Sequence, residues 1–150
     1  MIDVGRFTVA VFQDALWARR GVEALLRNGF VPESLTILAL DSRTTSQLIE
    51  DLLGPGPSRF ELKALGVVSA KGPLIAALQG EDEGLTALGL GGAIGRAGFQ
   101  QHDGYIFETL TGRGGVLVAI RSEPRAADAL ATLHAYGGGN AAIGAWTGRV

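Results

Sequence analysis

The sequence predicts an α+β fold in which two βαβ-like repeats form a four-stranded, ferredoxin-like sheet with two helices on one face, and a Gly/Ala-rich helical insert separates the halves. Three observations predict this arrangement: an internal repeat, a strand–helix–strand pattern in each copy, and a long intervening segment with its own apolar periodicity. We expect a single domain over residues 1–150, with repeat half one at about 6–40, the insert at about 41–114 and repeat half two at about 115–146.

The internal repeat appears as a constant offset between the two ends of the chain. Without any gap, Val9 aligns with Leu117 and Gly29 aligns with Gly137. Few aligned residues are identical, but the apolar positions agree along both copies, as two copies of one structural unit require. A small parallel α/β layer is the alternative arrangement of the same elements.

Each copy begins and ends with a run of strand length. The first strands are predicted at 6–12 (RFTVAVF) and 115–121 (GVLVAIR), because β-branched and aromatic residues dominate these runs. The second strands are predicted at 34–40 (SLTILAL) and 140–146 (NAAIGAW).

A helix is predicted between the two strands of each copy, because apolar residues recur there at i, i+4 and i+7. The two core stripes are Ala18, Val22 and Leu25, and Ala126, Leu130 and Leu133. Asp14 and Ser122 stand where N-cap residues are favoured, and Pro124 suits a first turn. Gly29 and Gly137 follow the helices, where a left-handed C-cap favours glycine.

The insert contains several short predicted elements, which distinguishes it from a structureless loop. A helix is predicted at 44–53, followed by a break at 54–58 (GPGPS) and a strand or hairpin at 60–70. Three short helices are predicted at 73–78, 85–97 and 103–110. The apolar periodicity of these elements predicts that the insert folds onto the repeats.

The first predicted strand is apolar on both faces. Phe7, Val9 and Val11 face one way, while Ala10 and Phe12 face the other. Helices on one side only would leave an apolar sheet face in water, so the insert, a partner subunit or both must cover it. We therefore expect a homo-oligomer, with Val11 and Phe12 as candidate interface residues.

The segment GLGGAIGRAG (89–98) contains five glycines in ten residues and invites comparison with a phosphate-binding loop. The dinucleotide fingerprint places its third glycine at position 94, which is Ile94, and no Gly-Lys-Ser/Thr of a P-loop is present. The Gly91-x-x-x-Gly95 spacing permits close helix approach, as in membrane helix pairs, but no span of membrane length surrounds it. We favour the interpretation that these glycines lack side chains so that a helix can pack closely against its neighbour.

Polar candidates for a binding pocket cluster in the insert. His102, Tyr105 and Glu108 lie close together in the sequence and are the candidate pocket residues. The adjacent Asp103 does not give His102 the geometry of a catalytic triad, and it is instead a candidate N-cap. His134, beside a core leucine, is interpreted as a structural histidine. No catalytic, cofactor-binding or metal-binding residues are predicted.

The charged residues indicate a solvated surface. Acidic clusters at 50–51 and 81–83 lack the alternating ligands and glycine of a calcium loop. Arg19, Arg20 and Arg27 form a small basic face, for which anion or RNA contact is the alternative interpretation.

The composition limits the classes of function. Hydrophobic residues make up 47% and charged residues 19%, which is typical of a globular chain. The net charge of −2 argues against a nucleic-acid partner, and the lack of cysteine excludes disulfides and thiolate chemistry. Neither a signal peptide nor a membrane span is predicted, so a soluble, cytoplasmic protein is expected.

Two stretches resemble the bacterial general stress (heat-induced stress) protein domain family. The first is VAVFQDALWARRGVEALLRNGFVPESLTILA, and the second is FETLTGRGGVLVAIRSEPRAADALATLHAYGG, with Glu108, Gly114 and Gly115 in the expected order. The segment HDGYIFE (102–108) departs from the family by carrying a glycine where a helix former is usual. The resemblance implies a cytoplasmic, stress-associated protein without an established catalytic activity.

These observations together favour a non-catalytic bacterial stress protein that acts as an oligomeric structural or ligand-sensing module. It needs no cofactor, and a small-molecule ligand is compatible with this role. The alternative is a small enzyme or a nucleotide- or metabolite-binding module, with its pocket at the insert. A third hypothesis is peripheral membrane association through the Gly/Ala segment.

Overall fold

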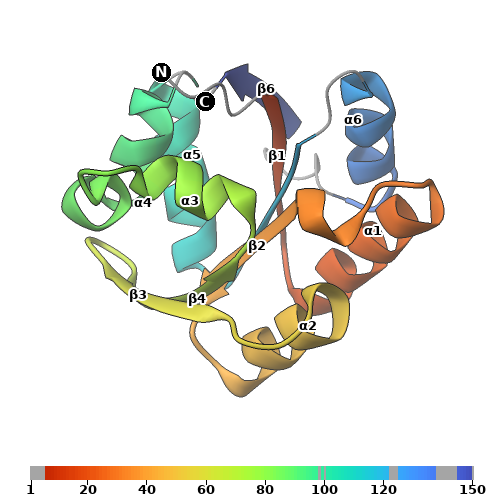
Figure 1. Cartoon of the computed structure of the whole chain (residues 1–150), viewed down its shortest axis with the longest axis horizontal. Helices are drawn as coiled ribbons and strands as arrows, with labels where there is room; N and C mark the ends of the chain where they lie inside the picture. Colours follow the sequence, from red (N-terminus) through yellow and green to blue (C-terminus); the bar gives the residue numbers. More distant parts are fainter. Residues whose placement is uncertain (1–5, 98, 100, 122–124, 138–144, 150) are drawn as a thin grey trace.

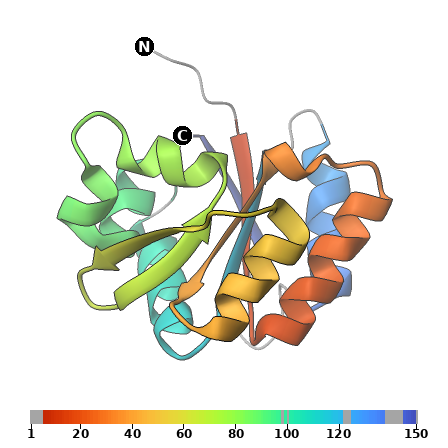
Figure 2. The same cartoon turned by 60° about the horizontal axis from the view of Figure 1, so that its bottom comes forward.

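The computed structural model describes residues 6–97, 99, 101–121, 125–137 and 145–149. Over these residues the fold is α+β, with six α-helices and a six-stranded sheet in the order β3-β4-β2-β5-β1-β6. The sheet lies between two groups of helices (Figure 1). Helices α1, α2 and α6 lie on one side, and α3, α4 and α5 lie on the other (Figure 2).

The elements follow one another along the chain with short connections. In chain order they are β1 (Arg6–Phe12), α1 (Ala15–Arg27), the 3-10 turn η1 (Pro32–Ser34), β2 (Leu35–Leu40), α2 (Arg43–Leu53), β3 (Ser58–Leu62), β4 (Gly66–Lys71), α3 (Pro73–Gln79), α4 (Gly84–Arg96), α5 (Gln101–Gly112), β5 (Val116–Arg121), α6 (Ala126–Ala135) and β6 (Ala145–Arg149). The hairpin and the short helices predicted between residues 60 and 110 are therefore present.

Every strand pair in the sheet is antiparallel. Strand β1 pairs with β5 on one side and β6 on the other, β2 pairs with β5 and β4, and β3 pairs with β4. The alternative of a small parallel α/β layer is therefore wrong. The described last strand is Ala145–Arg149, and residues 140–144 of the predicted strand lie outside the described residues. The position of β6 is set by its pairing with β1, a long-range contact that local propensity does not report.

The alternation along β1 divides the interior into two cores, as predicted. Phe7, Val9 and Val11 belong to the core beneath α3, α4 and α5, whereas Ala10 and Phe12 belong to the core beneath α1, α2 and α6. All five side chains are fully buried. Successive strand residues point to opposite faces, so an apolar strand buried on both faces must supply both cores.

The described residues at the ends of α1 and after α6 agree with the caps predicted from the sequence. Asp14 is the N-cap of α1, and its carboxylate accepts a hydrogen bond of 3.0 Å from the Trp17 N–H. Gly29 and Gly137 have positive φ angles of 92° and 94°, which glycine adopts without steric cost. Ser122 and Pro124 lie outside the described residues.

The buried face of α6 is rotated from the core stripe that the sequence predicts. In α6 the buried residues are Ala129, Thr132 and Leu133. Leu133 was predicted, but Ala126 and Leu130 are only half-buried. The i, i+4, i+7 spacing also fits neighbouring positions in an alanine-rich helix, so periodicity alone defines its buried face poorly.

Val11 and Phe12 are core residues of this chain and present no surface to a partner. A Cβ atom added at Gly21 of α1 would lie 2.5 Å from Phe12 Cζ, so the helix rests directly on this ring. Val11 is enclosed on the opposite face, where a Cβ added at Gly115 would lie 2.8 Å from its Cγ1. Their assignment as interface residues is replaced by a core role, because the chain covers both faces of its own sheet.

Candidate functional site

A hollow of about 310 Å³ lies along the outer face of α5. The described residues that line it are His102, Tyr105, Ile106, Thr109 and Leu110. Their spacing of three and four residues places them on one side of the helix. Half of the Tyr105 side chain is exposed, while Ile106 and Leu110 are half-buried, so the wall of the hollow is largely apolar.

The structure brings two of the three predicted pocket residues together. His102 and Tyr105 both line the hollow, whereas Glu108 does not. The Glu108 carboxylate instead accepts a hydrogen bond of 3.0 Å from the backbone N–H of Gly91 in α4. Glu108 therefore connects two helices and is not a polar group of the hollow.

The partner of Glu108 lies just beyond a break in α4. Gly89 has φ 79° and ψ 175°, values that interrupt the helix. A helical segment that restarts after such a break has backbone N–H groups without intrahelical acceptors. Glu108 supplies the acceptor for Gly91, so a carboxylate of the chain itself satisfies this N–H group.

The glycine segment also provides clearance between helices, as the sequence suggested. A Cβ atom added at Gly104 in α5 would lie 2.5 Å from the carbonyl oxygen of Gly91 in α4. The same addition at Gly91 would lie 2.8 Å from Cδ1 of Tyr105. Gly104 is the glycine of HDGYIFE at which the sequence departs from the pattern of the stress-protein family. In the structure it allows the backbones of α4 and α5 to come into contact.

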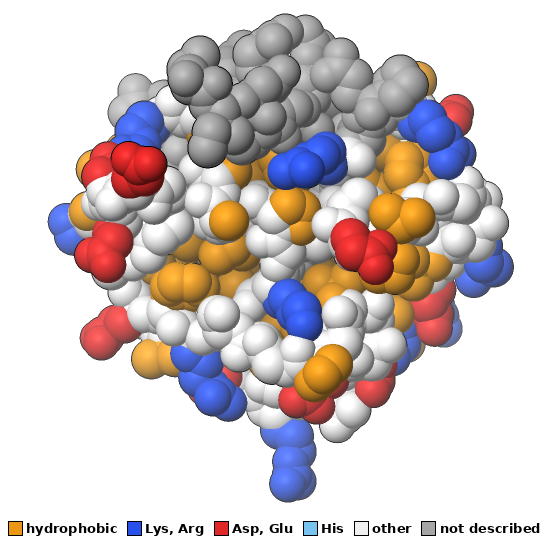
Figure 3. Space-filling view, in the orientation of Figure 1, with side chains coloured by type: hydrophobic (Ala, Val, Ile, Leu, Met, Phe, Trp, Pro, Cys, Tyr) orange, Lys and Arg blue, Asp and Glu red, His pale blue; other side chains and the backbone are white. Residues whose placement is uncertain are grey.

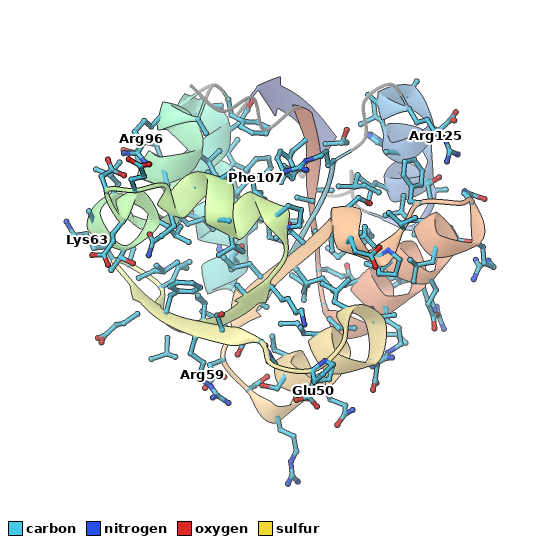
Figure 4. The ribbon with its side chains drawn as sticks, viewed as in Figure 1. Glu50, Arg59, Lys63, Arg96, Phe107 and Arg125 are labelled. Carbon is cyan, nitrogen blue, oxygen red and sulfur yellow. The ribbon has the colours of Figure 1, made fainter. Side chains whose placement is uncertain are left out.

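The opposite face of α5 belongs to the core. Phe107, labelled in Figure 4, is fully buried. Its ring makes an edge-to-face contact with Phe99 at a centroid distance of 6.4 Å. Asp103 lies in the first turn, 7% exposed, two residues after the helix begins. Asp103 is therefore a first-turn acid inside the helix and not its N-cap.

One acid of each acidic cluster singled out in the sequence forms an ion pair on the surface. Arg19 pairs with Asp51 at 3.0 Å, and Arg96 pairs with Asp82 at 2.6 Å. The Arg96 guanidinium lowers the pKa of Asp82, and the pKa of Asp51 is lowered by hydrogen bonds from Gln47 and then Arg19. Charges of both signs are interspersed over the face seen in Figure 3, with apolar groups between them.

Two arginines of the basic face of α1 also contact aromatic side chains of the same chain. The Arg20 guanidinium lies 5.1 Å from the ring centroid of Trp17, and Arg27 donates a hydrogen bond of 3.3 Å to the hydroxyl of Tyr136. His134 is exposed in the last turn of α6. Helix α6 lies on the opposite side of the sheet from α5 (Figure 1). Among the residues that the structure describes, no three His, Asp or Glu side chains are grouped so as to hold a metal ion.

Three further hollows lie elsewhere on the described surface. Two of them, of about 380 and 180 Å³, lie between α1 and α6, and one of about 330 Å³ lies near the start of α3. Two of their cationic side chains are bonded within the chain: Arg27 donates to the Tyr136 hydroxyl, and Lys71 Nζ donates to the carbonyl of Pro55. The hollow of α5 is the one that combines apolar walls with the two predicted residues.

Three lining residues, Ile106, Thr109 and Leu110, were missed by the sequence reasoning. They follow His102 and Tyr105 at helical spacing, so a helical projection of residues 101–112 would have placed all five on one face. The hollow offers an imidazole, two hydroxyl groups and apolar surface, which are suited to holding a small molecule.

Comparisons with protein-family models, with curated proteins and with solved structures find no match for this chain. Among the described residues, no helix is long and apolar enough to cross a membrane.

Proposed function

We propose that this chain is a non-catalytic ligand-binding module that acts in a bacterial stress response, and that its binding site is the hollow on α5. The observation that supports the proposal is the combination of His102 and Tyr105 with the apolar side chains of Ile106 and Leu110 around one volume of about 310 Å³. Ligand sites are concave, mostly apolar and supplied with a few polar groups, and this hollow has the size of a small one. The stress association rests on the family resemblance of the two repeat halves.

A binding role fits the site better than the alternative of a small enzyme. That alternative requires His102, Tyr105 and Glu108 to act together, but the Glu108 carboxylate is bonded to the Gly91 N–H and does not line the hollow. Asp103 is buried and is not among the described lining residues, whereas His102 is exposed. General acid–base catalysis requires the partners to lie within hydrogen-bonding reach of one substrate, and neither carboxylate of α5 lines the hollow.

We also propose that the architecture derives from a ferredoxin-like pair of βαβ repeats. The order β2-β5-β1-β6 within the sheet supports this derivation, as does the position of α1 and α6 on the same face. The elements from α2 to α5 then form the insert, which adds the hairpin β3–β4 to the sheet and covers the second face with α3, α4 and α5.

A thermal-shift screen with small metabolites tests the binding function. A ligand at 100 times its Kd raises the free energy of unfolding by about 2.7 kcal/mol, which is a measurable rise in Tm. Ile106→Trp fills the hollow and should abolish the shift, whereas Leu16→Trp, at an exposed apolar position of α1, should preserve it. A shift that survives Ile106→Trp would place the ligand elsewhere and contradict the proposal.

The stress association is tested separately in the source bacterium. Deletion of the gene should reduce survival after heat shock, and the wild-type gene should restore it. A gene that encodes the Ile106→Trp variant should fail to restore survival, although the variant protein accumulates to the wild-type level. Equal survival of the deletion strain would contradict a role in the stress response.

A further inference from the structure

We propose that the ligand of the α5 hollow is an amphipathic organic anion, with its carboxylate at His102 and its apolar body along Tyr105, Ile106 and Leu110. This inference rests on the proposed binding function and adds the chemical class of the ligand. It derives from the order in which polar and apolar groups follow one another along the helix.

The polar end of the hollow is the N-terminal end of α5. His102 lies in the first turn and Leu110 in the last, about 12 Å apart at a rise of 1.5 Å per residue. The apolar side chains of Ile106 and Leu110 lie toward the C-terminal end. The Thr109 hydroxyl is the one polar side-chain group of the described lining at that end. A ligand in this hollow therefore meets the imidazole at one end and mainly carbon at the other.

The charge at the polar end favours an anion. His102 is exposed and its imidazole N–H is available as a donor, and the N-terminal turn of a helix carries a positive partial charge. Neither carboxylate of α5 is among the described lining residues: Asp103 is buried, and Glu108 accepts a hydrogen bond from Gly91. None of the described lining residues is acidic, so a cationic head group would find no partner here.

The dimensions favour a small molecule with a single apolar body. A volume of about 310 Å³ lies at the lower limit of ligand pockets, and the wall is formed by one face of a helix. A medium-chain carboxylate or an aromatic carboxylate of similar size meets these requirements. The half-exposed ring of Tyr105 offers a flat apolar surface against which either can pack.

Three probes that share one apolar chain separate the contribution of the head group. Octanoate, 1-octanol and octylamine, each below its aggregation limit, are titrated calorimetrically into the whole chain. Octanoate should bind about tenfold more tightly than octanol, the ratio expected for one charge-assisted hydrogen bond, and octylamine should bind most weakly.

Substitutions assign the effect to the hollow. His102→Ala should weaken octanoate about tenfold and leave octanol unchanged, because the charge-assisted bond alone is lost. His134→Ala, at the exposed histidine of α6, should change neither affinity. Leu110→Gln should weaken both probes while leaving the far-ultraviolet circular dichroism unchanged, and Ile106→Trp provides a second test if that variant does not fold.

The outcomes distinguish the two proposals. Equal affinity for octanoate and octanol, with no effect of His102→Ala, would overturn the anionic ligand but leave the binding function intact. Tighter binding of octylamine than of octanoate would also overturn the anionic ligand and leave the binding function intact. If none of the three probes binds and the metabolite screen is also silent, the binding function itself is overturned.

Discussion

Gly104 is the residue at which two helix backbones come closest. A methyl group there would lie 2.5 Å from the carbonyl oxygen of Gly91, an atom of the backbone that cannot rotate away. The pair therefore fixes the separation of α4 and α5, and through α5 it fixes the position of the hollow.

Gly104→Ala should lower the free energy of unfolding by about 1–3 kcal/mol, the usual cost of overpacking a well-packed contact. Gly112→Ala is the matched control, because its methyl group would meet only the end of the Leu65 side chain, at 3.3 Å. That control should be neutral or slightly stabilising, since alanine is favoured over glycine in helices. Urea denaturation measures both, and equal stability of the two variants would show that the backbones do not meet at Gly104.

Glu108 acts at the same scale by satisfying the Gly91 N–H. Glu108→Ala should destabilise the fold by about 1–3 kcal/mol, because the backbone N–H of the buried Gly91 loses its acceptor. Glu108→Gln keeps an acceptor oxygen and should cost less. Denaturant midpoints check the order of the two variants, and a Gln variant as unstable as the Ala variant would contradict the hydrogen-bonding role.

At the scale of elements, a polar link holds the hairpin β3–β4 to the end of β2. Asp41 follows β2, and its carboxylate accepts hydrogen bonds from Ser69 in β4 at 2.6 Å and from Arg59 in β3 at 3.2 Å. The Ser69 hydroxyl and then the Arg59 guanidinium lower the pKa of Asp41. A carboxyl group with a lowered pKa in the folded state stabilises the fold above its ordinary pKa, and this contribution is lost as the pH falls through the folded-state pKa.

Ser69→Ala should therefore raise the pKa of Asp41 toward its ordinary value, and by more than Arg59→Gln does. Carboxyl chemical shifts followed through an acid titration measure the pKa directly. The stability that Asp41 contributes should then be lost at higher pH in Ser69→Ala than in the wild type. A larger change in Arg59→Gln would show that the ion pair, and not the hydroxyl group, dominates.

Several elements could be predicted from the sequence because their signals are local. The alternation of Phe7, Val9 and Val11 with Phe12 assigned the strand faces, since a strand has a strict period of two. The buried face of α6 could not be predicted equally well, because small residues surround it. The break at Gly89 was also missed, since it depends on the acceptor that Glu108 brings from another helix.

The candidate site was predicted only in part for a similar reason. His102 and Tyr105 were recognised as polar residues near one another, but the apolar half of the hollow was not. Glu108 has the right chemistry for a pocket residue and was assigned to the hollow with them. Its turn toward α4 follows from the contact between Gly91 and Gly104, which sequence spacing does not reveal.

At the scale of the whole molecule, each face of the sheet is covered by helices of the same chain. The sheet therefore does not need a partner subunit to cover it. A homo-oligomer stays a prediction. Light scattering coupled to size exclusion tests it against the chain mass of 15.6 kDa. A mass above this value on dilution would support self-association through another surface, and a stable mass of 15.6 kDa would contradict the homo-oligomer.

The central claim is that α5 carries a binding site on its outer face. Amide chemical shifts of the isotope-labelled chain, followed during titration with octanoate, test this claim most directly. The claim predicts saturable shifts concentrated at residues 102–110 and absent in Ile106→Trp. Shifts concentrated between α1 and α6, or no saturable shift with any ligand of the metabolite screen, would contradict it.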